Sequence, residues 1–315
     1  MKSDSRIYVA GASGMVGRAL VRHLYEQNGC NHVIAPSRQD LDLTEVNQVE
    51  NFFVETRPEF VFLAAAKVGG ICANDAHPAE FITTNLRIQT NVISMAAKYG
   101  VERLLFFGSA CAYPKYAAVP VEESALGTGE LEPTNRAYAT AKIAGIEMCD
   151  AYRIQHGCDF VSCMPTNLYG IGDHYNLENS HVLPGMMRRI HEAKVNGHES
   201  VTLWGTGSPT REFLFNDDLA IAATRIMNCA VAPRLVNITS GLEVSLGTLA
   251  GVIAATVGFT GEIIWDTTRP DGTPRRALDK SGMAGLGWQP QMPLEKGIQI
   301  TYQDFLEQEK AGLLA

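Results

Sequence analysis

The sequence has no excess of basic residues, no long hydrophobic run and no metal-type grouping of cysteines. Its 26 lysines and arginines stand against 34 aspartates and glutamates, a formal net charge of −8, which argues against a nucleic-acid-binding surface. No apolar stretch approaches the roughly 20 residues that cross a bilayer. We therefore expect a small-molecule partner rather than nucleic acid or membrane, with any anion held by a local cluster of donors.

The seven cysteines show neither metal-ligand spacing nor the even number of a complete disulfide framework. This usage fits a reducing compartment, and no metal site is expected. The first residues lead directly into an apolar run at 6–10, which leaves no room for a signal peptide. Together these features predict a cytoplasmic protein.

Short apolar runs alternate with amphipathic stretches through the first half of the chain. Strands are predicted at 6–10, 32–36, 60–66, 102–108 and 159–164, and helices at 15–27, 46–56, 78–98 and 136–156. This βαβ rhythm predicts a parallel sheet with helices on both faces, because crossovers between parallel strands are right-handed. The expected fold class is α/β, with a doubly wound, Rossmann-type sheet.

After Pro165 the pattern becomes less regular, with loops rich in glycine, asparagine and proline. Helices are still indicated near 181–195, 217–228 and 293–309, and strands near 200–204 and 234–238. We predict a dinucleotide-binding domain at 1–168, joined by 211–240, and a smaller, irregular α/β substrate-binding lobe at 169–315.

The first predicted strand runs into a glycine-rich turn. Gly11, Gly14 and Gly17 allow a pyrophosphate to approach the N-terminus of the following helix, where free N–H groups and the helix dipole favour an anion. Such a turn alone is a weak signal, but its place after the first strand of a βαβ series favours a dinucleotide. The predicted phosphate cradle comprises Gly11, Ala12, Ser13, Gly14, Met15, Val16 and Gly17.

The end of the second predicted strand favours NADP over NAD. An NAD site usually places an acidic residue there on the ribose 2′-hydroxyl, whereas this strand leads into Ser37 and Arg38. A guanidinium suits a 2′-phosphate, so NADPH/NADP is the expected cofactor. Asp42 has two possible roles, a contact with adenine or the capping of a helix before Thr44.

Tyr138 and Lys142 lie four residues apart, on one face of a predicted helix. A nearby ammonium favours the phenolate, so the pair predicts a phenol that works as a general acid or base near neutral pH. Ser109 follows a predicted strand and is expected at the carboxyl ends of the strands, where open α/β sheets bind ligands. There it can donate to the same substrate oxygen as Tyr138.

With the glycine turn, these residues resemble the extended short-chain dehydrogenase/reductases, and longer stretches resemble the GDP-L-fucose synthase family. Those stretches are 63–70, 108–115, 165–170, 179–184, 203–213 and 270–275. That family inverts C3 and C5 of GDP-4-keto-6-deoxy-D-mannose and then reduces its C4 ketone with NADPH. The resemblance implies the same activity and substrate here, in a homodimer.

The resemblance also implies roles for single residues. Cys111 is implied as the base and His181 as the acid of the inversions. Ser109 and Tyr138 are implied to hold the oxygen that carries enolate charge, and Lys142 to bind the nicotinamide ribose. Further cofactor contacts are implied at Pro165, Asn167, Leu168 and His181. Nucleotide-sugar contacts are implied at Arg189, Trp204, Arg211 and Asp279, with Lys115 as a further candidate.

Several alternatives stay open. Without the family, Cys111 would ordinarily be a small packing residue and His181 a helix cap. A GDP-colitose synthase, which epimerises only C5, shares this chemistry, and an NAD-dependent nucleotide-sugar 4-epimerase would need neither residue. A non-catalytic NADP-sensing protein of this fold is disfavoured because Tyr138 and Lys142 are both present.

Overall fold

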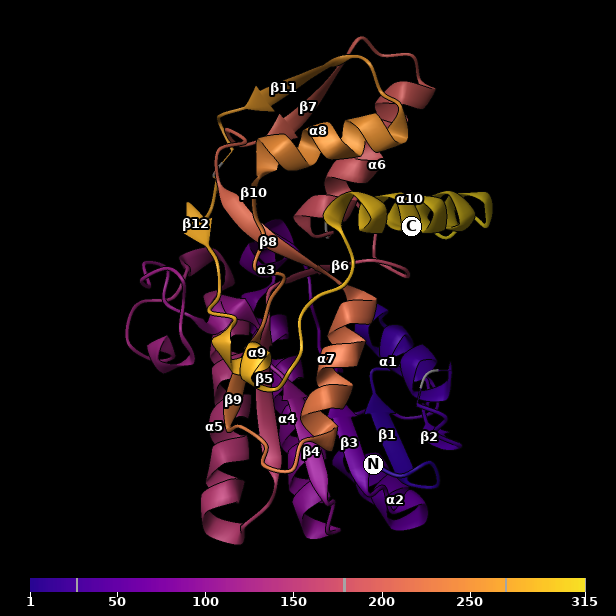
Figure 1. Cartoon of the computed structure of the whole chain (residues 1–315), viewed down its shortest axis with the longest axis vertical. Helices are drawn as coiled ribbons and strands as arrows, with labels where there is room; N and C mark the ends of the chain where they lie inside the picture. Colours follow the sequence, from indigo (N-terminus) through magenta and orange to yellow (C-terminus); the bar gives the residue numbers. More distant parts are fainter. Residues whose placement is uncertain (27, 178–179, 270, 315) are drawn as a thin grey trace.

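Six parallel strands form the lower sheet of the computed structural model, which describes all residues except 27, 178–179, 270 and 315 (Figure 1). The strands are β1 (Arg6–Ala10), β2 (His32–Ile34), β3 (Phe60–Leu63), β4 (Arg103–Phe107), β5 (Phe160–Pro165) and β9 (Leu235–Ile238). Their order across the sheet is β2-β1-β3-β4-β5-β9. This arrangement confirms the predicted doubly wound parallel sheet.

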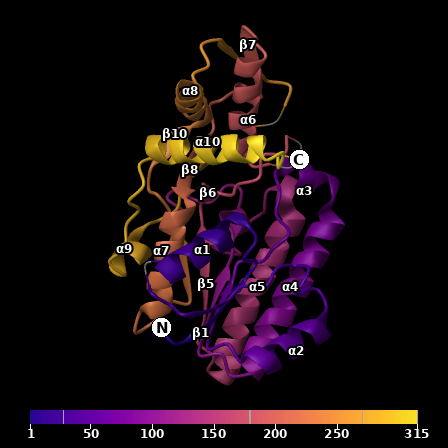
Figure 2. The same ribbon diagram turned by 90° about the vertical axis from the view of Figure 1, so that its right-hand side faces the viewer.

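Helices cover both faces of this sheet because each strand buries alternate side chains on opposite sides (Figure 2). Ile7 and Val9 pack in one core with α1 (Met15–Glu26) and α7 (Asn216–Asn228). Tyr8 and Ala10 pack in the other core, with α2 (Val46–Thr56), α4 (Pro78–Lys98) and α5 (Arg136–His156). The strand order reverses beside β1, so the ligand crevice is expected at the carboxyl ends of the strands.

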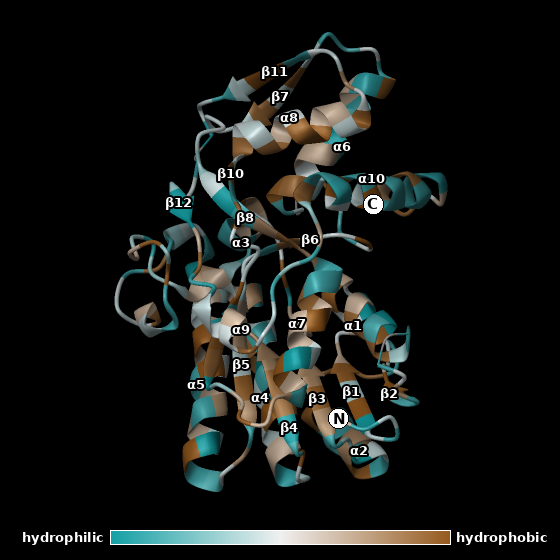
Figure 3. Cartoon of the chain, viewed as in Figure 1, coloured by the Kyte–Doolittle hydropathy of each residue, from teal (hydrophilic) through white to brown (hydrophobic). Residues whose placement is uncertain are grey.

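The upper lobe is built from two smaller sheets and has a core of its own (Figure 1). In one sheet β8 (Thr210–Phe215) pairs with β6 (Asn167–Tyr169), β10 (Glu243–Ser245) and β12 (Arg275–Arg276). Separately, β7 (Ser200–Trp204) pairs with β11 (Glu262–Asp266). The core lies among α6 (Val182–Val195), α8 (Leu246–Val257) and α10 (Leu294–Lys310). Hydrophobic colour concentrates in the strands of the lower sheet, whereas the outer helices mix both colours (Figure 3).

The chain returns from the upper lobe to the lower sheet more than once. Strand β9 pairs with β5, and α7 packs against α1. The short helix α9 (Ser281–Gly285) lies beside β9, and Met283 and Trp288 are buried in the core on that side. The domain division at 168/169 stays a prediction. The structure adds that α9, late in the chain, also packs against the lower sheet.

Two of the sequence stretches behind the family resemblance include residues outside the described part of the chain. These residues are Asn179 and Pro270. Among the described residues, no helix has both the length and the apolar character needed to span a bilayer. Nor do the described residues contain a group of three or more His, Cys, Asp or Glu side chains able to hold a metal ion.

Candidate active site

The turn between β1 and α1 requires glycine at two positions. Gly11 has a φ of +87°, and a Cβ there would lie 2.7 Å from the Ala65 backbone. A Cβ on Gly17 would lie 2.1 Å from the Gly11 carbonyl oxygen. The Gly14 N–H donates to that same oxygen at 3.1 Å, which closes the turn. These two glycines therefore let the strand, the turn and the start of α1 pack closely together, which is the arrangement that holds a pyrophosphate at a helix N-terminus in dinucleotide-binding folds.

Arg38 lies beyond the carboxyl end of β2 with an exposed side chain. Asp42 instead accepts from the Thr44 N–H at 2.9 Å and from the Thr44 hydroxyl at 2.8 Å. These hydrogen bonds, with a smaller contribution from Arg38, lower the pKa of Asp42. Asp42 thus stabilises the turn before α2, and the Arg38 guanidinium faces solvent where it suits a 2′-phosphate. The glycine turn and Arg38 together fit NADP.

Lys142 is buried beneath the carboxyl end of β4. Its ammonium donates to the Phe107 carbonyl oxygen at 2.7 Å and lies 5.9 Å from the centre of the Tyr138 ring. Burial lowers the pKa of Lys142 to about 8. On the neighbouring helix, the Gln89 amide donates to the Ala141 carbonyl oxygen at 2.7 Å. This bond fixes α5 against α4 at the level of the tyrosine and the lysine.

The Tyr138 phenol and the Ser109 hydroxyl share a hydrogen bond. Burial raises the pKa of Tyr138, the neighbouring Cys111 raises it further, and the bond to Ser109 opposes both. The prediction that Lys142 favours the phenolate is therefore wrong for this structure, in which the ammonium is bonded to the Phe107 carbonyl oxygen. Tyr138 stays a neutral phenol, the form that donates a proton.

Cys111 lies in a short 3₁₀ turn, Ala110–Ala112, which we call the Cys111 turn. The Cys111 N–H donates to the Ser109 hydroxyl oxygen at 3.3 Å, so Ser109 caps the turn. The Cys111 side chain is partly exposed, whereas Cys149 and Cys163 are fully buried and burial raises the pKa of both thiols. Cys111 therefore differs from the packing cysteines in being open to a ligand.

His181 is the N-cap residue of α6, but its side chain makes no capping hydrogen bond. His181 is accessible to solvent. The protein around the imidazole nevertheless replaces part of its water, and this desolvation lowers the pKa of His181. The nearby His174 lowers that pKa further. Among the described residues no hydrogen bond joins His181 to Cys111. The capping role considered for His181 is thus not seen, and its role toward a ligand stays a prediction.

Arg211 and Arg276 are register partners on the parallel strands β8 and β12, so their side chains leave the same face of the sheet. Burial lowers the pKa of Arg211 to about 10, and the charge of Arg276 adds to this, whereas Cys111 acts in the opposite direction. The Arg276 guanidinium donates to the Ala110 carbonyl oxygen. The sequence did not single out Arg276, and its one signal was its place directly after a stretch that resembles the family.

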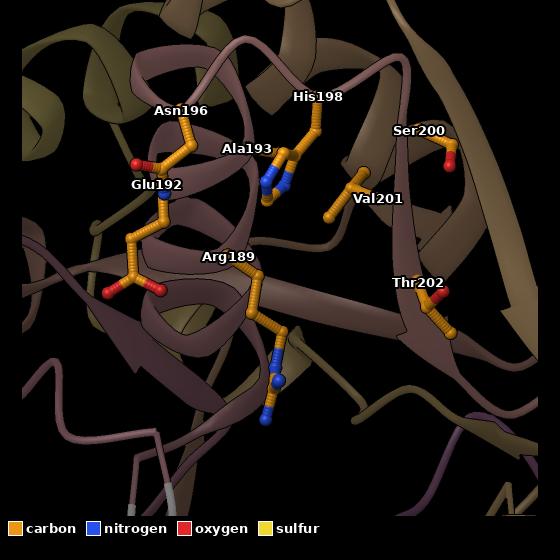
Figure 4. Close-up of a pocket in the computed structure, with 8 residues that line it drawn as sticks. All are labelled: Arg189, Glu192, Ala193, Asn196, His198, Ser200, Val201 and Thr202. Atoms are coloured by element: carbon orange, nitrogen blue, oxygen red, sulfur yellow. The ribbon is translucent and has the colours of Figure 1, made fainter.

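Two guanidiniums lie over the ring of Trp204 in the upper lobe. The Cζ atoms of Arg189 and Arg269 are 4.9 Å and 5.1 Å from the centre of its ring, within cation–π range. Trp204 is 39% exposed and is therefore not a core residue. A cavity of about 330 Å³ lies beside Arg189, between α6 and β7, and contains none of the predicted catalytic residues (Figure 4). It is lined by Arg189, Glu192, Ala193, Asn196, His198, Ser200, Val201 and Thr202.

The remaining predicted cofactor contacts follow β5. Pro165 is the last residue of that strand, and Asn167 and Leu168 belong to β6. The Asn167 amide donates to the Glu212 carbonyl oxygen at 3.2 Å, and Leu168 packs against the core shared by α1 and α7. These residues lie at or just beyond the carboxyl end of β5, which pairs with the strand that precedes Ser109. Their contact with the cofactor stays a prediction.

Two of the predicted nucleotide-sugar contacts are engaged within the protein. Asp279 accepts from the Ser281 N–H at 3.2 Å, and Lys115 pairs with Glu132 at 3.0 Å. Sequence reasoning also missed the buried Glu212, whose carboxylate accepts from the Leu278 N–H at 2.8 Å and so joins β8 to the segment that carries Asp279. The structure does not bring Asp279 together with Arg189 and Trp204 through any contact between described residues.

Comparisons with known proteins agree with this geometry. The model of the NAD dependent epimerase/dehydratase family matches residues 7–239. GDP-L-fucose synthase 1 of Arabidopsis thaliana is 54% identical over 304 residues, covering 96% of this chain and 94% of that protein. GDP-L-colitose synthase of Yersinia pseudotuberculosis is 33% identical over 306 residues, covering 96% and 99%. The crystal structure of a GDP-L-fucose synthetase from Naegleria fowleri bound to NADP gives a TM-score of 0.91 at 27% identity, covering 98% and 96%.

Proposed function

We propose a mechanism for this chain from the premise that it belongs to the GDP-L-fucose synthases, within the NAD dependent epimerase/dehydratase family. It is an NADPH-dependent epimerase and reductase that converts GDP-4-keto-6-deoxy-D-mannose to GDP-L-fucose. The observation that supports our assignment of the site is the meeting of Ser109, Cys111 and Tyr138 at the carboxyl edge of the sheet. A hydroxyl, an open thiol and a neutral phenol there are the groups that this double reaction needs.

Inversion starts at the carbons beside the C4 ketone, because loss of a proton there leaves an anion that delocalises onto the ketone oxygen. In our proposal Cys111, as thiolate, removes the proton. His181 returns a proton from the opposite face, and its lowered pKa makes the protonated imidazole a stronger acid. The two residues come from separate parts of the chain, the Cys111 turn and the N-cap of α6, and in our proposal each acts on one face of the sugar.

Ser109 and Tyr138 hold the oxygen on which the enolate charge develops. Burial raises the pKa of Tyr138, so the phenol keeps its proton while the enolate forms. Bound NADPH supplies the hydride that reduces C4. Tyr138 then gives its proton to the C4 oxygen, and Lys142, held against the Phe107 carbonyl oxygen, presents its ammonium beside the phenol.

The binding groups divide between the two parts of the fold. The glycine turn and Arg38 hold the cofactor phosphates, and Lys142 binds the nicotinamide ribose. Arg189 and Arg211 supply positive charge for the diphosphate of the sugar nucleotide, and Trp204 packs against its base or sugar. Helices α4 and α5 pack together on one face of the sheet (Figure 2), and we infer a homodimer through their outer sides, in the cytoplasm.

The alternatives differ in what the site must do. A C5-only epimerase-reductase would use the same groups, but the identity to GDP-L-fucose synthase 1 of A. thaliana, 54%, exceeds the 33% to the colitose synthase. A nucleotide-sugar 4-epimerase has no use for the open thiol of Cys111. No feature of the described residues favours either alternative over the double epimerisation.

The test is a reaction of the protein with NADPH and GDP-4-keto-6-deoxy-D-mannose in deuterated water. We expect loss of absorbance at the NADPH band and deuterium at both C3 and C5 of the product, read by NMR. Deuterium at C5 alone would favour the colitose-type activity. Reduction without deuterium at either carbon would contradict the epimerase assignment and leave the reductase intact.

A further inference from the structure

Arg276 joins the upper lobe to the Cys111 turn. Its guanidinium donates to the Ala110 carbonyl oxygen, and also to the Thr273 hydroxyl at 3.4 Å. Ala110 is buried and stands in the chain between the residue that holds the substrate oxygen, Ser109, and the residue that removes the proton, Cys111. A side chain 166 residues further along the chain thus bonds the backbone between these two groups.

Arg276 lies next to a second positively charged side chain, that of Arg211. Its register partner is Arg211, and the two guanidiniums repel, as the lowered pKa of Arg211 shows in part. None of the ion pairs between described residues includes either guanidinium. A partly buried cation without a carboxylate needs other acceptors, and for Arg276 the acceptor is the Ala110 carbonyl oxygen. The contact is therefore strong and directional.

Ser109 has anchors that do not involve Arg276. It directly follows β4, where the Gly108 N–H donates to the Cys163 carbonyl oxygen at 2.8 Å. Its side chain also bonds to Tyr138 on α5. The other hydrogen bonds of the Cys111 turn are local: the Ala112 N–H donates to the Ser109 carbonyl oxygen at 2.9 Å, and the Tyr113 N–H donates to the Ala110 carbonyl oxygen at 3.3 Å. The bond from Arg276 is the one that ties this turn to the upper lobe among the described residues. Loss of Arg276 is therefore expected to displace Cys111 more than Ser109.

We propose that Arg276 is a positioning residue for epimerisation, which holds the Cys111 turn so that the thiol faces the carbons beside the ketone. Hydride transfer to C4, which uses Ser109 and Tyr138, does not depend on it. This inference rests on the proposed function, because it concerns a step within the same reaction. It adds a residue of the upper lobe to the machinery for proton removal.

The chain offers a matched control in Arg275. This arginine stands next to Arg276 on the same strand, but its side chain pairs with Glu243 through two hydrogen bonds of 2.7 Å. The Arg275 side chain is 56% exposed and has no contact with the Cys111 turn among the described residues. Arg275→Gln therefore removes a positive charge from β12 and leaves the contact between Arg276 and Ala110 in place, so it controls for the loss of charge.

The experiment compares wild type, Arg276→Gln, Arg276→Lys and Arg275→Gln with NADPH and GDP-4-keto-6-deoxy-D-mannose in deuterated water. For Arg276→Gln we expect deuterium per product molecule at C3 and C5 to fall at least about tenfold, while the KM for NADPH is unchanged. Sugar reduced at C4 without deuterium then becomes the main product. Arg276→Lys, which keeps a charged donor, should recover part of the uptake, and Arg275→Gln should match wild type.

Three results would overturn the inference. A raised KM for the sugar nucleotide with normal deuterium per product in Arg276→Gln would make Arg276 a diphosphate ligand instead. An equal loss of deuterium uptake and of reduction, without recovery in Arg276→Lys, would show a general structural role. Wild type that consumes NADPH without taking up deuterium would remove the proposed epimerisation, and the inference with it, before any variant is compared.

Discussion

The six-stranded sheet and the upper lobe differ in how they expose side chains. Every residue of β5 is buried, as are four of five in β4, whereas β7 alternates buried and exposed residues. The sheet therefore presents functional groups only where its strands end, at Ser109 and the Cys111 turn. The lobe presents Trp204 and its arginines from strands and helix faces. In our proposal the fixed sheet therefore carries Ser109, Tyr138 and the Cys111 turn, whereas the open lobe supplies His181 and the charges that meet the sugar nucleotide.

The largest effect is expected at the fixed scaffold, for Tyr138→Phe. Loss of the phenolic proton removes the donor to the C4 oxygen, so kcat for NADPH oxidation should fall about 10³-fold, with the KM for the sugar nucleotide little changed. Steady-state kinetics at the NADPH band measure both. A kcat within tenfold of wild type would place the proton donor elsewhere.

A smaller and different effect is expected in the lobe, for Arg211→Gln. Arg211 is partly buried and forms no ion pair among the described residues, although the charges of Asp271 and Glu132 act on it, so an anionic diphosphate suits it as a partner. The KM for the sugar nucleotide should rise about 10- to 100-fold, and the KM for NADPH should not change. An effect confined to kcat would mean that this region, too, serves the chemical step.

Lys142 offers a test by pH of the cofactor-free protein. Its pKa is about 8 in the folded protein and about 10.4 in an unfolded chain. Between these values the unfolded chain binds more protons, so this residue makes the free energy of unfolding rise with pH. Relative to Lys142→Met, wild type should gain on the order of 1–3 kcal/mol between pH 8 and pH 10 in urea unfolding. Parallel curves for the two proteins would show that the folded ammonium is not desolvated.

The smallest effects compare one helical glycine from each region. A Cβ on Gly145 in α5 would lie 2.4 Å from the Phe106 ring, whereas a Cβ on Gly251 in α8 would meet nothing within 4 Å. Gly145→Ala should lower the free energy of unfolding by about 1–3 kcal/mol through overpacking. Gly251→Ala should raise it by about 0.5–1 kcal/mol, because alanine favours an exposed helix. Equal effects of one sign in urea unfolding would contradict the difference in packing.

The difference in burial between the six-stranded sheet and the upper lobe also decides how much of the fold is predictable from sequence. The strands of the lower sheet lie where apolar runs predict them, because strands buried on both faces read as continuous hydrophobic segments. In the lobe, β6, β10 and β12 have only two or three residues, too few to show a period. Helix α8, Leu246–Val257, was also missed, since its run of small and apolar residues lacks a polar face.

The candidate site, too, has features that the sequence predicts and features that it does not. Residues close in sequence, such as Ser109 with Cys111 and Tyr138 with Lys142, are recognisable from their spacing. The contact of Arg276 with Ala110 is not, because it joins distant segments. The raised pKa of Tyr138 was missed for the same reason, since it comes from burial by the folded chain.

In our proposal one ketone oxygen, held by Ser109 and Tyr138, serves both the inversions and the reduction, and Cys111 serves only the inversions. The most direct test is Cys111→Ser in deuterated water, with deuterium at C3 and C5 counted against NADPH consumed. We expect deuterium per product molecule to fall about 100-fold while NADPH is still oxidised to give a sugar reduced at C4. Deuterium at both carbons at the wild-type level would contradict the claim.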